Sequence, residues 1–147
     1  MEERLRQQFW SDLLHLALRQ TGLHSSLLKR VPKGHDCKVP TGVTGIYYLY
    51  EISDRRGYSH IYLNGSKEYN KSRFKCLEQW KQEIHEAFGD ELLWYLMPQQ
   101  KSSYFGKYFY SGGLADQDRW PAIQQEMVDA MVRLERTMPP FFARLKG

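Results

Sequence analysis

The sequence predicts a single α+β domain over residues 1–147, in which one mainly antiparallel sheet of about four strands packs against three helices. Two observations lead to this fold class. The stretch 73–94 has the pattern of an amphipathic helix, a glycine stop at Gly89 and an immediate strand. Elsewhere, aromatic-rich segments occur in pairs, as in antiparallel hairpins. The expected order is α-β-β-α-β-β-α, and 147 residues suit one domain with a sizeable core.

The first helix is expected from about Glu2 to Gln20, because apolar residues recur along it at helical spacing, and Gly22 should end it. Residues 21–42 come next, and Pro and Gly interrupt any regular pattern there. Several basic side chains lie in the same stretch. We expect a long irregular loop, and such loops inside compact domains are often binding loops.

Two strands should follow, over 43–52 and 58–64, because both segments are rich in β-branched and aromatic residues. The residues between them, 53–57, read Ser-Asp-Arg-Arg-Gly and predict a tight turn. The two strands should therefore form an antiparallel hairpin.

A second helix, two further strands and a last helix should follow the hairpin. After the helix described first, the apolar run 92–97 predicts a buried strand and 103–110 a fourth strand. The last helix should begin near Asp118, and Pro139 and Pro140 should stop it.

No strong catalytic or metal-binding motif is present. A restriction-type nuclease needs an acid on one strand and Asp/Glu-x-Lys on the next, so that carboxylates hold Mg²⁺ beside a lysine. The only match is Asp36-Cys37-Lys38, inside the expected loop. The five histidines lack metal-ligand spacing, and Cys37 and Cys76 lack CxxC spacing. We therefore expect no catalytic residue, no metal and no cofactor.

The distribution of charge gives a first functional lead. Residues 1–75 contain thirteen Lys and Arg against seven Asp and Glu, whereas residues 76–147 contain eight against ten. A basic half favours an anionic partner such as nucleic acid. The residues expected to bind it are Lys29, Arg30, Lys33, Lys38, Arg55, Arg56, Lys67, Lys71, Arg73 and Lys107.

The tyrosines give a second lead. Those on the first hairpin and the fourth strand are Tyr47, Tyr48, Tyr50, Tyr58, Tyr62, Tyr104, Tyr108 and Tyr110. A tyrosine-bearing sheet face, edged by Lys101, Lys107, Arg55 and Arg56, could stack bases while the cations follow the phosphates. The competing interpretation is that these rings are cross-strand packing partners that need no ligand.

Short signatures spread over nearly the whole chain carry a family resemblance. They are Phe9-Trp10 with Leu13-Leu14, Gly42-Val43-Thr44-Gly45, the set Phe74, Leu77, Lys81 and Ile84, Phe88-Gly89 with Leu92 and Trp94, and Trp120 before the apolar last helix. In these residues the chain resembles the family catalogued as domain of unknown function 4268. The resemblance implies a module often carried beside restriction-endonuclease-like domains in DNA-processing or defence systems, and it assigns no catalytic residue.

We therefore expect a non-catalytic binding module of a DNA-processing or defence-associated system, which contacts DNA or RNA through a basic surface. A nuclease-like protein is a further candidate partner. The alternative is a protein-interaction or oligomerisation domain with no nucleic-acid contact, whose apolar patch would include Phe141-Phe142 and exposed tyrosines. The sequence leaves the oligomeric state open.

The sequence also bears on location. No apolar run approaches the roughly 18 residues that span a membrane, and the first residues include acids rather than a secretory apolar segment. We therefore expect a cytoplasmic protein without membrane contact.

Overall fold

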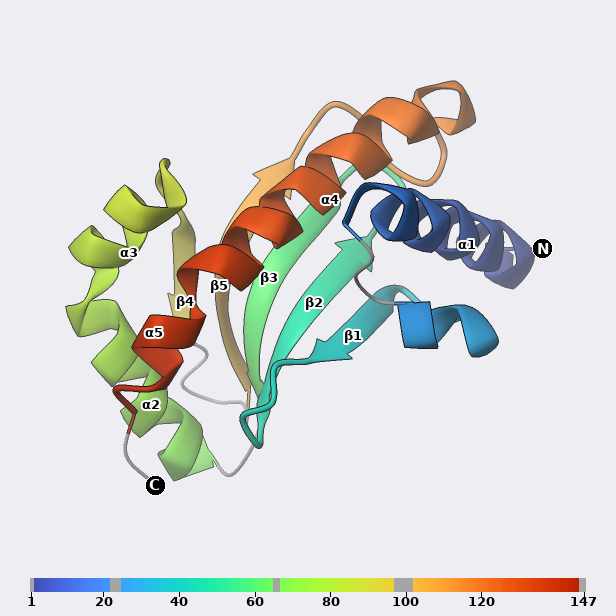
Figure 1. Cartoon of the computed structure of the whole chain (residues 1–147). Coiled ribbons are helices and arrows are strands. Elements are labelled where there is room, and N and C mark those ends of the chain that lie inside the picture. The colour runs from blue at the N-terminus through green and yellow to red at the C-terminus, as the bar shows by residue number, and fades with distance from the viewer. Residues whose placement is uncertain (1, 22–24, 65–66, 97–101, 146–147) are drawn as a thin grey trace.

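The computed structural model describes residues 2–21, 25–64, 67–96 and 102–145. Within these ranges the chain forms a five-stranded sheet, five α-helices and two short 3-10 helices (Figure 1). In chain order the elements are α1 (Glu2–Thr21), η1 (Ser25–Lys29), β1 (Asp36–Pro40), β2 (Ile46–Ile52), β3 (Gly57–Asn64), α2 (Lys67–Gln79), α3 (Lys81–Phe88), β4 (Leu93–Leu96), β5 (Ser102–Phe109), η2 (Gln117–Arg119), α4 (Trp120–Thr137) and α5 (Pro139–Phe142). None of these helices combines the length and apolarity needed to cross a membrane.

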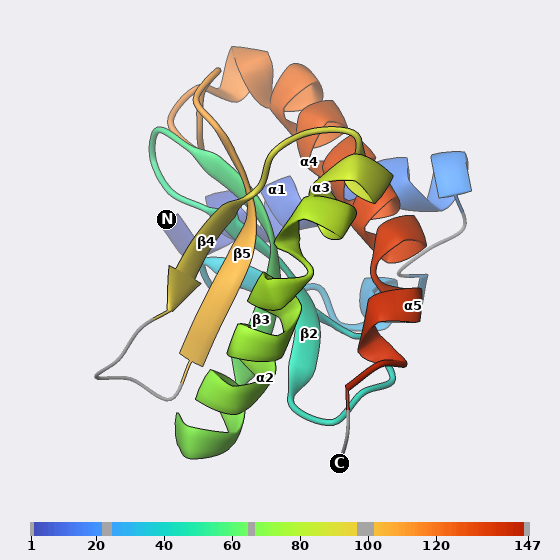
Figure 2. The ribbon, with the colours of Figure 1, turned by 90° about the vertical axis from the view of Figure 1, so that its left-hand side faces the viewer.

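Every strand is antiparallel to its neighbours, and the strands lie in the order β1-β2-β3-β5-β4. The second hairpin joins the first through β5, which pairs with β3 on one side and β4 on the other. The helices form a second layer. Figure 1 shows α4 crossing in front of the sheet, and Figure 2 shows α3, α4 and α5 on one side of β4 and β5.

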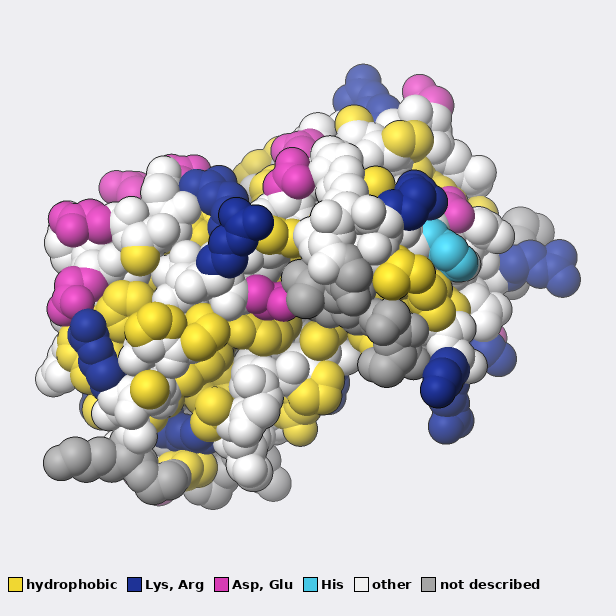
Figure 3. Space-filling model, viewed as in Figure 1, with side chains coloured by type: hydrophobic (Ala, Val, Ile, Leu, Met, Phe, Trp, Pro, Cys, Tyr) yellow, Lys and Arg dark blue, Asp and Glu magenta, His cyan; other side chains and the backbone are white. Residues whose placement is uncertain are grey.

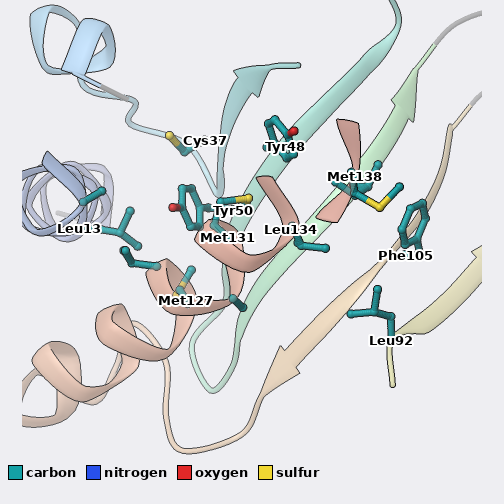
Figure 4. Packing of buried hydrophobic residues seen from close by; sticks show 14 of the residues in the cluster. Leu13, Cys37, Tyr48, Tyr50, Leu92, Phe105, Met127, Met131, Leu134 and Met138 are labelled. Atoms are coloured by element: carbon teal, nitrogen blue, oxygen red, sulfur yellow. The ribbon is translucent and has the colours of Figure 1, made fainter. Parts of the chain in front are cut away.

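The hydrophobic core lies between these two layers. Tyr48 and Tyr50 alternate with outward residues of β2 and are buried in the core, in the same cluster as Met127 and Met131 of α4 (Figure 4). Helix α1 packs into the same core through Trp10, whose ring centroid lies 6.4 Å from that of Tyr50. Apolar burial of this kind is the main stabilising contribution to such a fold.

The prediction of a mixed α and β fold with one antiparallel sheet is confirmed, but the expected number of strands is wrong. The fifth strand is β1, which lies inside the predicted loop 21–42 and pairs with β2. Pro40 ends this edge strand, where a missing N–H disturbs no ladder. Because Pro and Gly residues lie on both sides of this strand of five residues, apolar periodicity along the sequence does not reveal it. Gly22, the predicted end of the first helix, lies outside the described residues.

The expected number of helices is also wrong, first because one predicted helix is divided. The amide of Trp80 donates to the Leu77 carbonyl at 3.0 Å, an i to i+3 closure that ends α2. The Trp80 carbonyl then accepts from the Ile84 amide at 2.8 Å and starts α3. Gly89 ends α3 with φ 92°, as predicted, because a left-handed residue is needed there.

The remaining extra helix is α5, which follows the two prolines expected to stop helical structure. Pro139 is its first residue, a position where a missing N–H costs nothing. The amide of Phe142 donates to the Met138 carbonyl at 3.0 Å and closes the turn. The prolines therefore end α4 and begin a new helical turn that buries both phenylalanines.

Candidate functional site

The sheet face away from the helices is formed by alternate residues of all five strands, and their register aligns side chains in rows across the strands. Within the described chain, no helix covers this face. One row contains Tyr47, Tyr62, Tyr104 and Tyr95, each the Cα partner of the next. We call these four residues the tyrosine row. The ring centroids of Tyr47 and Tyr62 are 6.5 Å apart, and those of Tyr95 and Tyr104 are 5.3 Å apart.

A second aromatic group adjoins the tyrosine row and surrounds His60 of β3. The imidazole stacks on Tyr104 with 4.9 Å between centroids, and it lies 5.5 Å from the Tyr58 ring and 5.2 Å from the Tyr108 ring. Tyr58 and Tyr108 meet edge to face at 4.7 Å. Seven aromatic rings, those of Tyr47, Tyr58, His60, Tyr62, Tyr95, Tyr104 and Tyr108, thus cover the centre of the open face.

Gly106 provides the space that His60 occupies. The two residues are Cα partners on β5 and β3. A Cβ at position 106 would lie 2.7 Å from His60 Cα and 2.8 Å from its ring Cδ2, closer than atoms can approach. The absence of a side chain on Gly106 therefore lets the imidazole lie close to the backbone of β5.

His60 is an aromatic packing residue rather than an acid–base group. Its side chain is 2% exposed, and neither ring nitrogen has a hydrogen-bond partner within the described residues. Burial lowers the pKa of His60 to about 3, because the charged imidazolium would lose its hydration. A general base for neutral pH needs a pKa near 7, so this imidazole is unsuited to that role.

Two cations lie against tyrosines of the open face or its edge. Lys38 Nζ is 5.5 Å from the Tyr47 ring centroid and 5.6 Å from that of Tyr62, so it stands over one end of the tyrosine row. At the turn between β2 and β3, the Arg56 guanidinium lies 5.2 Å from the ring of the exposed Tyr110. Such cation–π contacts hold a positive charge in place without neutralising it.

The single Asp-x-Lys match lies on a strand, and the prediction that it lies in a loop is wrong. Alternation along β1 puts Asp36 and Lys38 on the open face, and the Cα partner of Asp36 is Glu51 of β2. Burial raises the pKa of Glu51, and the nearby Asp36 charge raises it further. The described residues hold no group of three His, Cys, Asp or Glu side chains able to bind a metal ion.

The other predicted contact residues lie away from the open face. Lys29, Arg30 and Lys33 line one open hollow beside η1. Lys107 points to the helix side and donates to Asp90 at 2.6 Å. Arg55 lies beside Arg56 in the β2–β3 turn and is exposed.

Helix α2 carries three more of the predicted residues. Arg73 is buried and donates to the Thr44 carbonyl at 2.7 Å, so it holds the loop before β2. Lys71 is half-buried. The side chain of Lys67, and all of Lys101, lie outside the described residues. Figure 3 shows Lys and Arg at separate places on the helix side, with hydrophobic atoms between them.

Sequence reasoning found part of the aromatic face and missed part of it. Tyr48 and Tyr50, grouped with the other hairpin tyrosines, point into the core. Tyr95 and His60 were missed. Alternation along β3 could have placed His60 on the face of Tyr58, but no local signal pairs Tyr95 with Tyr104.

The comparisons with known proteins place the sheet inside one family match. The family model described as a domain of unknown function (DUF4268) matches residues 5–141. No curated protein and no solved structure matches the chain. The matched segment contains the whole described sheet, so the open face is part of the family domain.

Proposed function

The chain belongs to the DUF4268 family, and from that premise we propose that it is a non-catalytic module that binds single-stranded nucleic acid on its open sheet face, within a DNA-processing or defence system. The observation that carries the proposal is the tyrosine row with Lys38 standing over it.

The spacing of the tyrosine row suits successive bases. Neighbouring strands lie about 4.8 Å apart, so a row across four strands offers several ring faces or edges at regular intervals. Base–aromatic stacking contributes about 1–3 kcal/mol per base and tolerates any base. A duplex hides the base faces, so this face should prefer a single strand.

The charges of the open face suggest where phosphates would lie. Lys38 can reach a phosphate next to a base on Tyr47 or Tyr62. Asp36 and Glu51 lie on the open face one row beyond Lys38, farther from the tyrosine row, and would repel a backbone at that corner of the face. The mixture of signs predicts binding that depends more on stacking than on charge, and therefore a shallow dependence on salt.

The direct test is a fluorescence-anisotropy titration of labelled single-stranded DNA, single-stranded RNA and duplex DNA at several salt concentrations. Tyr95→Ala should weaken single-strand binding by roughly 5- to 150-fold, the loss of one stacked base. Tyr69→Ala is the matched control, because Tyr69 lies on α2, outside this face, and is 37% exposed like Tyr95.

A second pair of variants tests the cation. Lys38→Ala should reduce the slope of log K against log salt by about 0.7, the value for one phosphate on a single strand. Lys107→Ala is its control, because that lysine is engaged by Asp90 on the other face. The proposal fails if no single strand binds at low salt, or if Tyr95→Ala and Lys38→Ala bind like wild type.

The same samples test for an enzyme. With Mg²⁺ present, the labelled strands are run on a denaturing gel. If the wild type cleaves the strands and Glu51→Gln does not, the proposal of a binding module is rejected. The protein would then be a nuclease whose site is built on Asp36, Glu51 and Lys38.

A second candidate function is self-association along β4. This strand is at the edge of the described sheet, and its outward Leu93 is 46% exposed. Unprotected edges of this kind can pair with another chain. The tail cannot supply the expected patch, because Phe141 and Phe142 are each only 6% exposed. Light scattering over a range of concentrations tests the idea, and a monomer at every concentration rejects it.

A further inference from the structure

A pocket of about 290 Å³ lies among α2, the junction of α2 with α3, and the residues after α5. Figure 1 shows α5 near α2, and the ring centroid of Trp80, at the α2–α3 junction, lies 6.4 Å from that of Phe141 in α5. The side chains that line it include Tyr69, Ser72, Arg73, Cys76, Trp80 and Arg144. The pocket is therefore separate from the open sheet face.

Arg73 contributes a buried positive charge to this pocket. Its side chain is 5% exposed, and Nη1 donates to the Thr44 carbonyl at 2.7 Å. Its Nε is buried and has no hydrogen-bond partner within the described residues. No carboxylate of the described chain forms an ion pair with it. A buried guanidinium without a counter-charge is costly, so an anion in the pocket would stabilise it.

Arg144 adds a second guanidinium, which is more exposed. It lies 5.2 Å from the Trp80 ring centroid and 4.7 Å from that of Phe141. Its present partner is Glu83, at 3.0 Å on the surface. Exposed ion pairs contribute little, so exchanging this carboxylate for a ligand oxyanion would cost little.

Apart from Ser72, the remaining walls are aromatic or apolar. Tyr69 lies under the Arg73 guanidinium, with 4.4 Å to the ring centroid, while Trp80 and Leu145 line the same pocket. Pockets that combine flat apolar walls with a few charged groups bind ligands of matching shape and charge. Guanidinium groups match the geometry of phosphate and carboxylate oxygens.

We propose that this pocket binds a small planar aromatic ligand that carries an oxyanion, either phosphate or carboxylate. Arg73 and Arg144 hold the oxyanion, and the aromatic ring lies against Trp80. This site is independent of nucleic-acid binding on the open sheet face.

Cys76 provides a direct reporter, because it lines the pocket and is only half-buried. The other thiol, Cys37, is buried, and burial raises its pKa to about 12, so it should stay unmodified. The rate at which neutral iodoacetamide alkylates the whole protein, followed by intact mass, then measures access to the pocket.

The probes are phenyl phosphate, benzoate, inorganic phosphate and the neutral ring phenol, at equal concentrations. Phenyl phosphate or benzoate should slow alkylation of Cys76, and the stronger of the two identifies the oxyanion. Phenol and inorganic phosphate should protect much less, because phenol lacks the oxyanion and inorganic phosphate lacks the aromatic ring. The proposal is overturned if phenol or inorganic phosphate protects Cys76 as strongly as the better of phenyl phosphate and benzoate. It is also overturned if no anion protects Cys76.

Variants then test the residues. Arg144→Gln should raise the ligand concentration that gives half-maximal protection of Cys76 about 10- to 150-fold, the effect of losing one hydrogen bond to a charged group. Arg136→Gln, an exposed arginine on α4 outside the pocket, should leave it unchanged. Tyr95→Ala should also leave it unchanged, which separates this site from the proposed function. Equal protection in Arg144→Gln and wild type, with unchanged near-UV circular dichroism, overturns the assignment.

Discussion

Replacing Gly106 by Ala should destabilise the fold and disturb the aromatic face at its centre. The added methyl group would lie 2.7 Å from His60 Cα and 2.8 Å from its ring, and it would also overlap the Ser59 carbonyl oxygen. Two of these three contacts are with backbone, which a change of rotamer cannot relieve. Strands β3 and β5 would have to separate locally.

The magnitude follows from three contributions. Overpacking of this kind costs about 1–3 kcal/mol, and each weakened ladder hydrogen bond costs about 0.5–1.5 kcal/mol. Alanine also restricts the unfolded chain, which stabilises the folded state by about 0.4–1 kcal/mol. The expected net loss is therefore about 2–3 kcal/mol.

Gly34 is the matched control, because a Cβ there meets no atom within 4 Å. Gly34→Ala should keep or slightly raise the free energy of unfolding. Urea unfolding followed by tryptophan fluorescence measures both variants, and an unchanged m-value shows that the unfolded state is unaltered. The reasoning is refuted if Gly106→Ala lies within about 0.5 kcal/mol of wild type, the range of ordinary surface changes.

Burial lowers the pKa of His60 to about 3, so between pH 6.5 and 3 only the unfolded chain gains a proton at this residue. In the wild type the free energy of unfolding should therefore fall on acidification, by up to about 1.4 kcal/mol per pH unit. His60→Phe should remove this fall, and urea unfolding at several pH values across that window measures it. Burial raises the pKa of Glu135 to about 7, so its stability contribution is present below pH 4.5 and is lost as pH rises through 7, a trend that Glu135→Gln should abolish in the same titration. Phe142→Ala should cost about 3–5 kcal/mol in the thermal or urea unfolding assay, because its ring is buried near Tyr48. Asp90→Asn should change the unfolding free energy by less than about 1 kcal/mol, because its pair with Lys107 is on the surface.

Each of these expectations has a clear opposite. A His60→Phe variant that loses stability in acid as steeply as wild type would mean that His60 titrates normally. If the stability of Glu135→Gln depends on pH as that of the wild type does, burial does not raise the pKa of Glu135. Unchanged stability in Phe142→Ala, together with a change in association state, would return Phe142 to an exposed interface. A loss of unfolding free energy well above about 1 kcal/mol in Asp90→Asn would show that the Asp90–Lys107 pair belongs to a cooperative network.

The helices show how far local pattern can be trusted. The apolar stripe predicted for the last helix is buried as expected in α4, and Gly89 ends α3 in the predicted conformation. The division at Trp80 was not predicted, because a helical stripe of apolar residues continues through it. The carbonyl and amide of Trp80 join two helices whose periodicities happen to agree.

The candidate site was predictable only in part. Tyr47, Tyr58 and Tyr62 could be assigned to a hairpin from composition alone, and alternation separates Tyr47 from the buried Tyr48. Lys107 and Arg73 were expected to meet phosphates, yet an ion pair and a carbonyl engage them. Charge counted along a chain does not show which cations already have partners.

Local signals in the sequence determined where most of the helices and strands form and which side of each is apolar, because these depend on residues a few positions apart; β1, the division at Trp80 and α5 were not among them. Strand order and register were decided by the tertiary structure. Tyr62 meets Tyr104, and His60 meets Gly106, only because β5 lies between β3 and β4. These residues are far apart in the chain, and packing of the complete sheet against its helices brings them together.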